Sequence, residues 1–444
     1  MENNFADKRQ DAKAIFQAGL LAVSPGEAIK RFCRLDGENL RVDGRDYDLN
    51  LFSKIFVLGF GKAGASMAKA IEEILGERIS AGVITVKYGH LEKLKTIKIQ
   101  EAGHPVPDEN GHAGAKEIYQ LASSADSETL VICLISGGGS ALMPYPVGEV
   151  TLEDKQEATK VLLACGADIH EINSVRKHLS VIKGGGLARA AYPATLITLI
   201  LSDVVGDDLD SIASGPCVPD PKTFSDCRAI FAKYSIESKI PSTVLRYIES
   251  GLAGTVPETP KSGQVFFEKT QNVIVARNFN ALLQAKEKAD ELGYNTLLLS
   301  SMIEGETRDV AVNHMAIGSE IELHGYPIEK PACLLSGGET TVTIKGAGKG
   351  GRNQEFVLAA ALKMKGMENC VVLSAGTDGS DGPTDAAGAI ADSSTLNRAA
   401  LKGLDGLQYL ENNDSYHYFD QLGDLYKTGP TNTNVMDLRI LIVG

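Results

Sequence analysis

Five glycine-rich segments carry the residue types from which an anion-binding site can be built. Lys62 lies inside the first segment and Arg352 inside the last. The segments are residues 59–64, 136–140, 183–186, 336–339 and 346–353. Glycine lets the backbone approach a ligand closely, and a helix that begins after such a turn offers unpaired N–H groups to an anion. Several such turns with an embedded lysine and arginine predict chemistry on more than one anionic group, such as phosphoryl transfer to a small acid.

The first segment also fits the G-x-G-x-x-G pattern of dinucleotide-binding domains. The next strand ends at Val86 and Lys87, where an NAD site would have an acidic residue for the ribose. A basic residue there can hold the 2′-phosphate of NADP, so an NADP enzyme stays open. A tight turn that binds no ligand is the other alternative. No G-x-x-x-x-G-K-[ST] occurs, which excludes a P-loop kinase.

The second segment follows residues 129–135, an apolar run typical of a strand buried on both faces. Its amides and hydroxyls would lie at the carboxyl edge of a parallel sheet, where ligands bind, and they suit a carboxylate or a phosphate. Arg176 and Lys177 add positive charge shortly before the third segment. For Arg176, a solvated basic surface is an equal alternative.

Two aspartates are candidate ligands for Mg²⁺. Asp203 comes directly after the strand expected at 194–201, and Asp378 lies in the acidic stretch 377–385. That stretch could also supply a general base, or be a turn built of Asp and Gly. Arg352 stands just before a helix expected from residue 355, where a guanidinium can reach a transferring phosphoryl group; the alternative is a structural ion pair.

Lys62, Arg352 and Asp203 are the catalytic candidates, the first two as cations for a transferring phosphoryl group and Asp203 as the preferred carboxylate. The substrate- and phosphate-binding candidates are Gly61, Ser136, Gly137, Gly138, Gly139, Ser140, Arg176, Lys177, Gly337, Gly338 and Asn353.

Composition limits the partners of this chain. Its 444 residues carry a formal net charge of -13, which disfavours nucleic acid or an anionic membrane as a partner. No apolar run approaches the ~20 residues of a membrane span, and the polar N-terminus does not read as a signal peptide. Seven cysteines without C-x-x-C spacing indicate a reduced, cytoplasmic protein.

Apolar strands alternate with helical patterns along most of the chain, which predicts an α/β fold. We expect a Rossmann-like first domain at 1–240 with helices on both faces of a parallel sheet, a linker rich in Pro, Ser and Gly at 241–270, and a smaller α/β domain at 271–444. Residues 1–45 are expected to be helical and to pack on the second domain. Residues 340–344 read as a strand after a turn at 336–338.

The motifs together resemble the second class of glycerate kinases, whose C-terminal part is the MOFRL domain. The matching segments are GFGKA at 59–63, EAGHPVPDENG at 101–111, LISGGGSAL at 134–142, NSVRKHLSVIKGGGLA at 173–188, LSDVVGDDLDSIASGP at 201–216, LLSGGETTV at 334–342, GKGGRNQE at 348–355, SAGTDGSDGPTDAAGA at 374–389 and the tail at 428–444. The resemblance runs in order through nearly the whole chain, and it places the MOFRL region at about 330–444.

The resemblance implies ATP-dependent phosphorylation of D-glycerate at its 2-hydroxyl with a divalent metal such as Mg²⁺. It implies that Lys62 and Arg352 are catalytic and that the active site lies in the cleft between two α/β domains. We also expect a monomer or a homodimer. Members have also been named hydroxypyruvate reductases. An NADP-dependent reductase and a non-catalytic sugar-acid-binding module therefore remain the alternatives.

Overall fold

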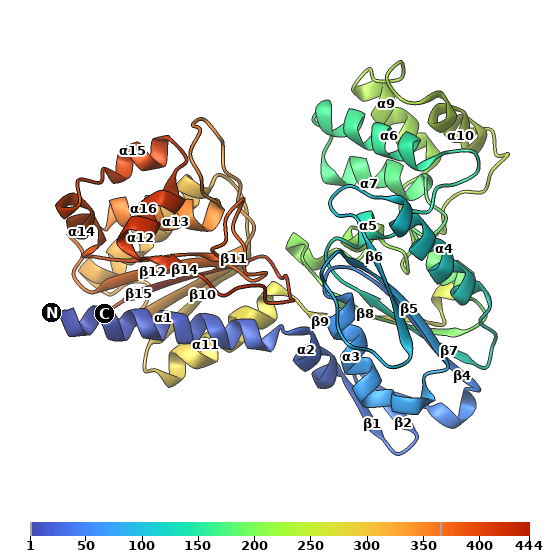
Figure 1. The fold of residues 1–444 in the computed structure, drawn as a ribbon, viewed down its shortest axis with the longest axis horizontal. Helices are drawn as coiled ribbons and strands as arrows, with labels where there is room; N and C mark the ends of the chain where they lie inside the picture. Colours follow the sequence, from blue (N-terminus) through green and yellow to red (C-terminus); the bar gives the residue numbers. More distant parts are fainter. Residues whose placement is uncertain (1, 365) are drawn as a thin grey trace. The chain divides into compact units, whose positions relative to one another are not determined.

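The computed structural model describes residues 2–364 and 366–444, which form two compact units (Figure 1). One unit comprises residues 28–275, and the other comprises the N-terminal residues up to Glu27 together with 276–444. Each unit has its own six-stranded sheet and its own hydrophobic core. The predicted α/β class is confirmed. No helix in the described part of the chain is long and apolar enough to cross a bilayer.

The sheet of the unit 28–275 has a change of direction in its strand order. Its strands are β4 (Lys54–Phe60), β5 (Ala81–Lys87), β6 (Ile97–Ala102), β7 (Thr129–Ile135), β8 (Thr195–Leu201) and β9 (Thr270–Ala276). They lie in the order β6-β5-β4-β7-β8-β9, and every pairing from β6 to β8 is parallel. The chain thus moves outward in one direction after β4 and in the other after β7. Ligands of open α/β sheets bind at such a switch point.

Helices cover both faces of this sheet, as predicted. In β5, Thr85 and Val86 point to opposite faces because side chains alternate along a strand. Thr85 lies against Gly114 of α4 (Glu109–Ser123), while Val86 lies against Gly64 of α3 (Gly64–Leu75). The helix α8 (Gly186–Ala191) packs in the same core as α4. The short α5 (Gly139–Leu142) follows β7.

Four further helices of this unit lie above the sheet in Figure 1. They pack around a separate apolar core. They are α6 (Leu152–Ala164), α7 (Ile169–His178), α9 (Phe224–Lys233) and α10 (Ser242–Leu252). The buried side chains of Val175, Phe231 and Ile248 belong to this core.

Two expectations for this part of the chain were wrong in detail. Residues 33–48 are not helical but form an antiparallel sheet of β1 (Cys33–Asp36), β2 (Asn39–Val42) and β3 (Arg45–Asp48), because apolar residues alternate there and Gly37 and Gly44 adopt positive φ in the turns. The segment 241–270, expected as a linker, contains α10 within the unit 28–275. Val244 and Ile248 bury one face of that helix at a spacing of four residues.

The second unit contains a mixed sheet. Its strands are β10 (Asn295–Ile303), β11 (Ala332–Gly338), β12 (Cys370–Gly376), β13 (Gly388–Asp392), β14 (Leu425–Tyr426) and β15 (Asp437–Val443), in the order β10-β11-β15-β12-β13-β14. The C-terminal strand β15 lies between β11 and β12 and is antiparallel to both. Asp437, the first residue of β15, is therefore paired with the last residues of β11 and β12, Gly338 and Gly376.

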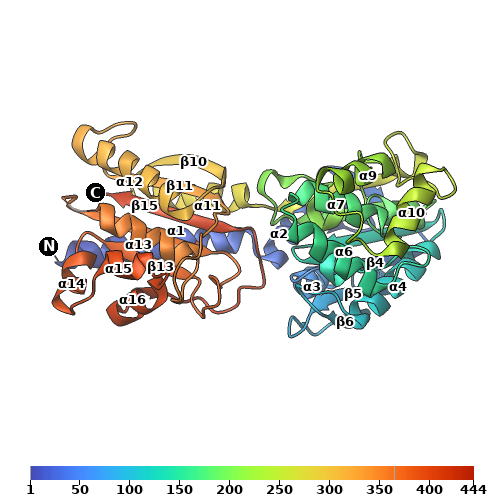
Figure 2. The same cartoon turned by 90° about the horizontal axis from the view of Figure 1, so that it is seen from above.

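Two layers of helices enclose this mixed sheet (Figure 1), and Figure 2 shows the same unit from above. On one face α1 (Glu2–Ala22) packs along α11 (Asn278–Glu291), and α12 (Thr307–His324) and α13 (Arg352–Lys363) cover the other. The remaining helices are α2 (Pro25–Phe32), which spans the boundary of the two units, and α14 (Thr395–Leu401), α15 (Gly406–Glu411) and α16 (Ser415–Leu422). The expected strand at 340–344 is reduced to one bridge between Thr341 and Glu306.

Candidate functional site

The two turns at the switch point are fastened to each other. The amide of Lys62 donates to the carbonyl oxygen of Gly137 at 2.9 Å, and the amide of Ala63 donates to the Ser136 hydroxyl at 3.0 Å. In return, the Ser136 amide donates to the carbonyl of Phe60 at 3.1 Å. Ser136 is buried, so its hydroxyl holds the first turn rather than facing a ligand. The backbone that carries Lys62 is thereby fixed in place.

The same bonds argue against a dinucleotide at the first turn. The amide of Gly61 donates to Thr85 at 3.1 Å and the amide of Gly64 donates to Gly61 at 3.0 Å. Together with the amides of Lys62 and Ala63, four consecutive N–H groups have protein acceptors. A pyrophosphate at this turn needs unpaired N–H groups. The G-x-G-x-x-G match therefore reflects a locked turn.

The packing of the two turns leaves no room for a side chain at Gly61. Its φ is +129°, and a Cβ would overlap the hydroxyl and carbonyl oxygens of Ser136. We expect Gly61→Ala to lower the free energy of unfolding by about 3 kcal/mol, because strain and a backbone clash add. Gly76→Ala is the matched control, since Gly76 also has a positive φ but open space around it. Denaturant unfolding of the two variants checks this, and equal losses would contradict the account.

Lys62 and His104 converge on Gly138. A Cβ on Gly138 would lie 2.9 Å from the His104 ring and 3.5 Å from the Lys62 Cε. Burial, and then the charge of Lys62, lower the pKa of His104 to about 4, so this ring is neutral near pH 7. Among the described residues, no carboxylate pairs with the half-buried Lys62 ammonium. A neutral imidazole and an unpaired ammonium beside a glycine turn suit an incoming anion.

The sequence reasoning assigned no role to His104. The residue follows β6 by two positions and so belongs to the same carboxyl edge of the sheet. Strand β6 (IKIQEA) has polar residues at half of its positions because it is the edge strand. Its sequence therefore lacks the continuous apolar run of a buried strand, which would have placed His104 at a strand end.

Asp203 and Lys183 contact two other residues of the 136–140 turn, Gly137 and Ser140. Asp203 packs so closely on Gly137 that any Cβ there would overlap its carboxylate. The Lys183 ammonium donates to the Ser140 carbonyl at 2.7 Å and to its hydroxyl at 2.9 Å. The Ser140 hydroxyl also lies 3.0 Å from that of Ser214. The turn predicted to bind an anion thus gathers Lys62, Asp203 and Lys183 around it.

Lys177 was predicted to bind substrate or phosphate, but its ammonium is paired inside the protein. It is 2% exposed, and its ammonium contacts Asp210 at 2.8 Å and Asp220 at 3.4 Å. Two carboxylates satisfy this lysine inside the protein, which argues for a structural role. Arg176, its neighbour on α7, is half-buried and makes no hydrogen bond or ion pair to a described residue.

Arg352 begins α13 in the other unit, three residues earlier than expected. Its Nε and Nη2 donate to both carboxylate oxygens of Asp437, at 2.7 and 3.0 Å, and Nη1 lies 2.8 Å from Glu339. Although burial acts against it, Asp437 raises the pKa of Arg352, so the guanidinium stays charged. The side chain keeps 31% of its surface exposed. The ion pair that was the alternative to a catalytic role is therefore present, on an arginine whose side chain is still partly exposed.

Asp381 holds the start of α13 in position. Its carboxylate accepts the amides of Asn353 and Gln354 at 3.0 and 2.8 Å. Burial and then the charge of Asp437 raise the pKa of Asp381 to about 6, although the two amides act to lower it. Asn353 is buried and bonds to Asp381 and Asp437, so it orients carboxylates instead of facing solvent. Asp378 accepts from the amide and hydroxyl of Ser380 in a turn.

Gly337 and Gly338 are not in a turn. Both belong to β11, and neither has room for a side chain. The side chain of Asn278 packs on Gly337, and the backbone of Ile303 packs on Gly338. The glycines allow this close packing, which is the common structural meaning of glycine within a strand.

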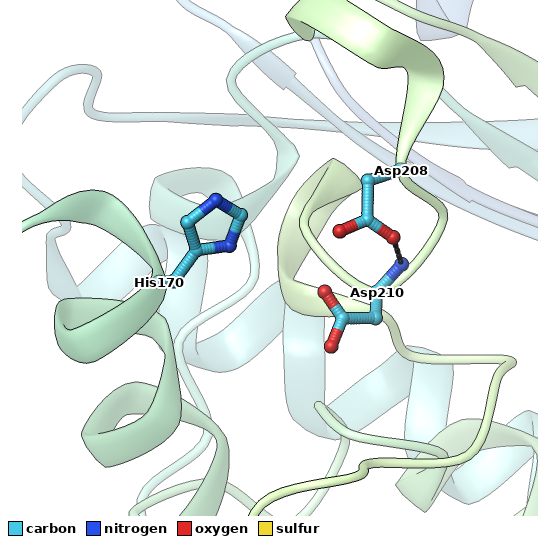
Figure 3. A group of neighbouring side chains, drawn as sticks. All are labelled: His170, Asp208 and Asp210. Carbon is cyan, nitrogen blue, oxygen red and sulfur yellow. Dashed lines mark hydrogen bonds between the residues drawn. The ribbon is translucent and has the colours of Figure 1, made fainter.

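Three side chains in the unit 28–275 could share a metal ion on geometry alone. His170, Asp208 and Asp210 each offer a ligand atom, and these atoms lie within 4.8 Å of one another (Figure 3). Asp210 already pairs with Lys177, and its amide donates to Asp208 at 3.3 Å. Exposed acidic groups often gather without a metal, so this cluster alone assigns nothing.

Fold and site together define an α/β enzyme that acts on an anionic substrate. A model described as a domain of unknown function, DUF4147, matches residues 11–249, and the MOFRL family model matches residues 332–437. The glycerate 2-kinase of Pyrococcus horikoshii is 42% identical over 98% of both chains. A crystal structure of glycerate kinase from Thermotoga maritima is 40% identical with a TM-score of 0.89, covering 99% of this chain and 100% of that one.

A further relative, from Agrobacterium vitis, carries a provisional name as a hydroxypyruvate reductase and is 40% identical over 99% of this chain and 96% of its own. The chain belongs to the MOFRL-containing glycerate kinase family. This membership confirms the resemblance drawn from the motifs.

Proposed function

We propose that this protein transfers the γ-phosphoryl group of ATP to the 2-hydroxyl of D-glycerate, which gives 2-phosphoglycerate and ADP. The observation that carries the proposal is the Lys62 ammonium, which has no carboxylate partner among the described residues and is held by a locked turn at the switch point of the sheet. Family membership supports the choice of acceptor and donor. The reaction consumes cellular ATP, and its substrate and product are small anions. We therefore expect it to take place in the cytoplasm.

In this reaction the cationic residues bind the anionic groups, and a carboxylate accepts the proton. The carboxylate of glycerate docks at the turn of Gly137 to Ser140 and its neighbouring cations. Lys62 and Arg352 are both needed to neutralise the phosphoryl group during transfer, and Asp203 accepts the proton of the 2-hydroxyl. A loose transition state needs little covalent help from the protein, so positioning and charge stabilisation supply most of the rate.

Carboxylate oxygens are suitable ligands for Mg²⁺, which favours a few of them together with phosphate oxygens and water. We propose that Asp203 or Asp378 holds such an ion. Asp378 fits because its hydrogen bonds from Ser380 use one carboxylate oxygen only, Oδ1. When bound with ATP, the cation would offset negative charge on the phosphates.

Two parallel assays separate a kinase from a reductase. We expect ADP to form from ATP only when D-glycerate is present, and we expect NADPH absorbance to stay constant with hydroxypyruvate. The locked amides of residues 61–64 are the reason for the second expectation. Rapid NADPH oxidation without glycerate-dependent ADP release would reverse the assignment. Binding of glycerate without either turnover would instead favour a binding module.

A further inference from the structure

Three basic side chains interact with one another in the unit 28–275, and none of them has an acidic partner among the residues that the structure describes. Lys155 comes from α6, Arg176 from α7 and Lys183 from the turn that precedes α8. Lys155 is 8% exposed and its ammonium has no hydrogen-bond partner, while Lys183 is 2% exposed. Arg176 makes no ion pair with any residue that the structure describes. We refer to these three residues as the basic triad.

The members of the triad repel one another. Burial, and then the charge of Arg176, lower the pKa of Lys155 to about 7. Burial followed by the charges of Lys155 and Arg176 lowers the pKa of Lys183 well below its usual range. Bringing like charges together out of water is costly, and a protein usually offsets a buried charge with a partner. This arrangement therefore lacks its counter-charge.

Lys177 shows that the missing counter-charge is specific to the triad. This lysine is next to Arg176 in the chain, is as buried as Lys183, and has two carboxylate partners, Asp210 and Asp220. The fold thus supplies acids to the lysine that points into the protein and none to the triad beside it. A general shortage of nearby acids does not explain the triad.

The triad adjoins the turn proposed to bind substrate. Lys183 donates to both the carbonyl and the hydroxyl oxygen of Ser140. The Ser140 hydroxyl in turn lies within hydrogen-bond distance of Ser214, which donates to Asn173. Ser140 is two residues from Gly138, the point on which Lys62 and His104 converge. An anion held by the triad would lie close to that point.

We infer that Lys155, Arg176 and Lys183 form the receptor for the carboxylate of a short 2-hydroxy acid. A guanidinium can bind both carboxylate oxygens and each ammonium can donate to one, so the bound acid would supply the missing negative charge. The identity of the acid as D-glycerate rests on the proposed function, whereas the anion site itself does not. The triad would also reject glycerol, which has the hydroxyls but no charge.

Lys155→Gln tests the receptor, with Lys160→Gln as its matched control. Lys160 lies on the same helix, is mostly exposed and pairs at the surface with Glu157. We expect Lys155→Gln to raise the Kd and KM for D-glycerate by roughly 10- to 100-fold, the effect of losing one charge-assisted hydrogen bond. The KM for ATP should stay unchanged, and Lys160→Gln should resemble the wild type throughout.

Binding is measured by calorimetry with D-glycerate and with glycerol, without ATP, so that the result does not depend on turnover. Wild-type binding of D-glycerate that Lys155→Gln weakens supports the receptor even if no phosphate is transferred, in which case only the proposed function fails. Equal binding by both glutamine variants overturns the receptor even if the kinase is active. No D-glycerate binding by the wild type, or equal affinity for glycerol, overturns it as well.

A melting curve excludes misfolding as the cause. Lys155→Met removes a buried charge that has no partner, so the melting temperature without substrate should rise by a few degrees. D-glycerate should then stabilise Lys155→Met less than it stabilises the wild type. A variant that melts lower than the wild type and still gains the full stabilisation from D-glycerate would contradict the receptor.

Discussion

Replacing Lys62 with methionine is expected to lower kcat for D-glycerate phosphorylation by about a thousandfold or more. A cation on the migrating phosphoryl group contributes on the order of 10³ to rate in comparable enzymes. The backbone of Lys62 is held by Gly137 and its ammonium has no carboxylate partner among the described residues, so the charge is available to a ligand. Methionine keeps the length and apolar stem of the side chain and removes only the charge.

Lys69→Met is the control for Lys62→Met. Lys69 lies on α3, the helix that follows the turn, and pairs at the surface with Glu92 at 2.9 Å. Its loss should leave kcat within about twofold of the wild type, because exposed ion pairs contribute little. Stopped assays at saturating ATP and glycerate measure both variants. A kcat for Lys62→Met within tenfold of the wild type would remove Lys62 from the transition state.

The second large effect is expected at Arg352. Arg352→Ala should lower kcat by about a thousandfold while the KM for glycerate changes by less than about tenfold, because the guanidinium acts on the transition state. The reverse pattern, a large rise in KM with kcat preserved, would assign Arg352 to ground-state binding. Asp437 would keep Arg439 at 3.2 Å and Asn353 at 2.8 Å as partners in this variant, so its carboxylate does not become isolated.

Arg308→Ala separates catalysis from structural support. Arg308 pairs at 2.7 Å with Glu355, which is on the same helix as Arg352, and its guanidinium also donates to the carbonyl of Leu410. We expect this variant to melt at a lower temperature with kcat nearly unchanged. Arg352→Lys completes the series, since it keeps the charge but loses the two-pronged contact to Asp437, and it should recover only part of the lost rate. Equal kcat losses in Arg308→Ala and Arg352→Ala would indicate a structural role for both.

The backbone of the site could be predicted from sequence because it depends on local patterns. Apolar strands followed by glycine turns placed Lys62 and the 136–140 turn at the carboxyl edge of a parallel sheet, and the structure brings these two turns together. The glycines before Arg352 likewise predicted the start of a helix, within three residues of where α13 begins. Each of these features is set by residues within a few positions of one another.

Partner assignments could not be predicted, because they depend on residues far apart in the chain. Lys177 looked like a ligand residue, but it is paired with carboxylates 33 and 43 positions away. Lys155 drew no notice because a lysine in a polar helix usually faces water, and only packing against α7 shows it to be buried. The glycines at 337 and 338 resembled a ligand turn, although the close packing of Asn278 and Ile303 accounts for them.

Transfer to the 2-hydroxyl is tested most directly by identifying the atom of glycerate that receives the phosphoryl group. Phosphorus NMR of the product from ATP and D-glycerate, recorded with proton coupling, distinguishes the two possible esters. We expect a phosphorus signal split by the single proton on carbon 2, as in 2-phosphoglycerate. A signal split by the two protons on carbon 3, or no phosphate ester from wild-type protein, would contradict it.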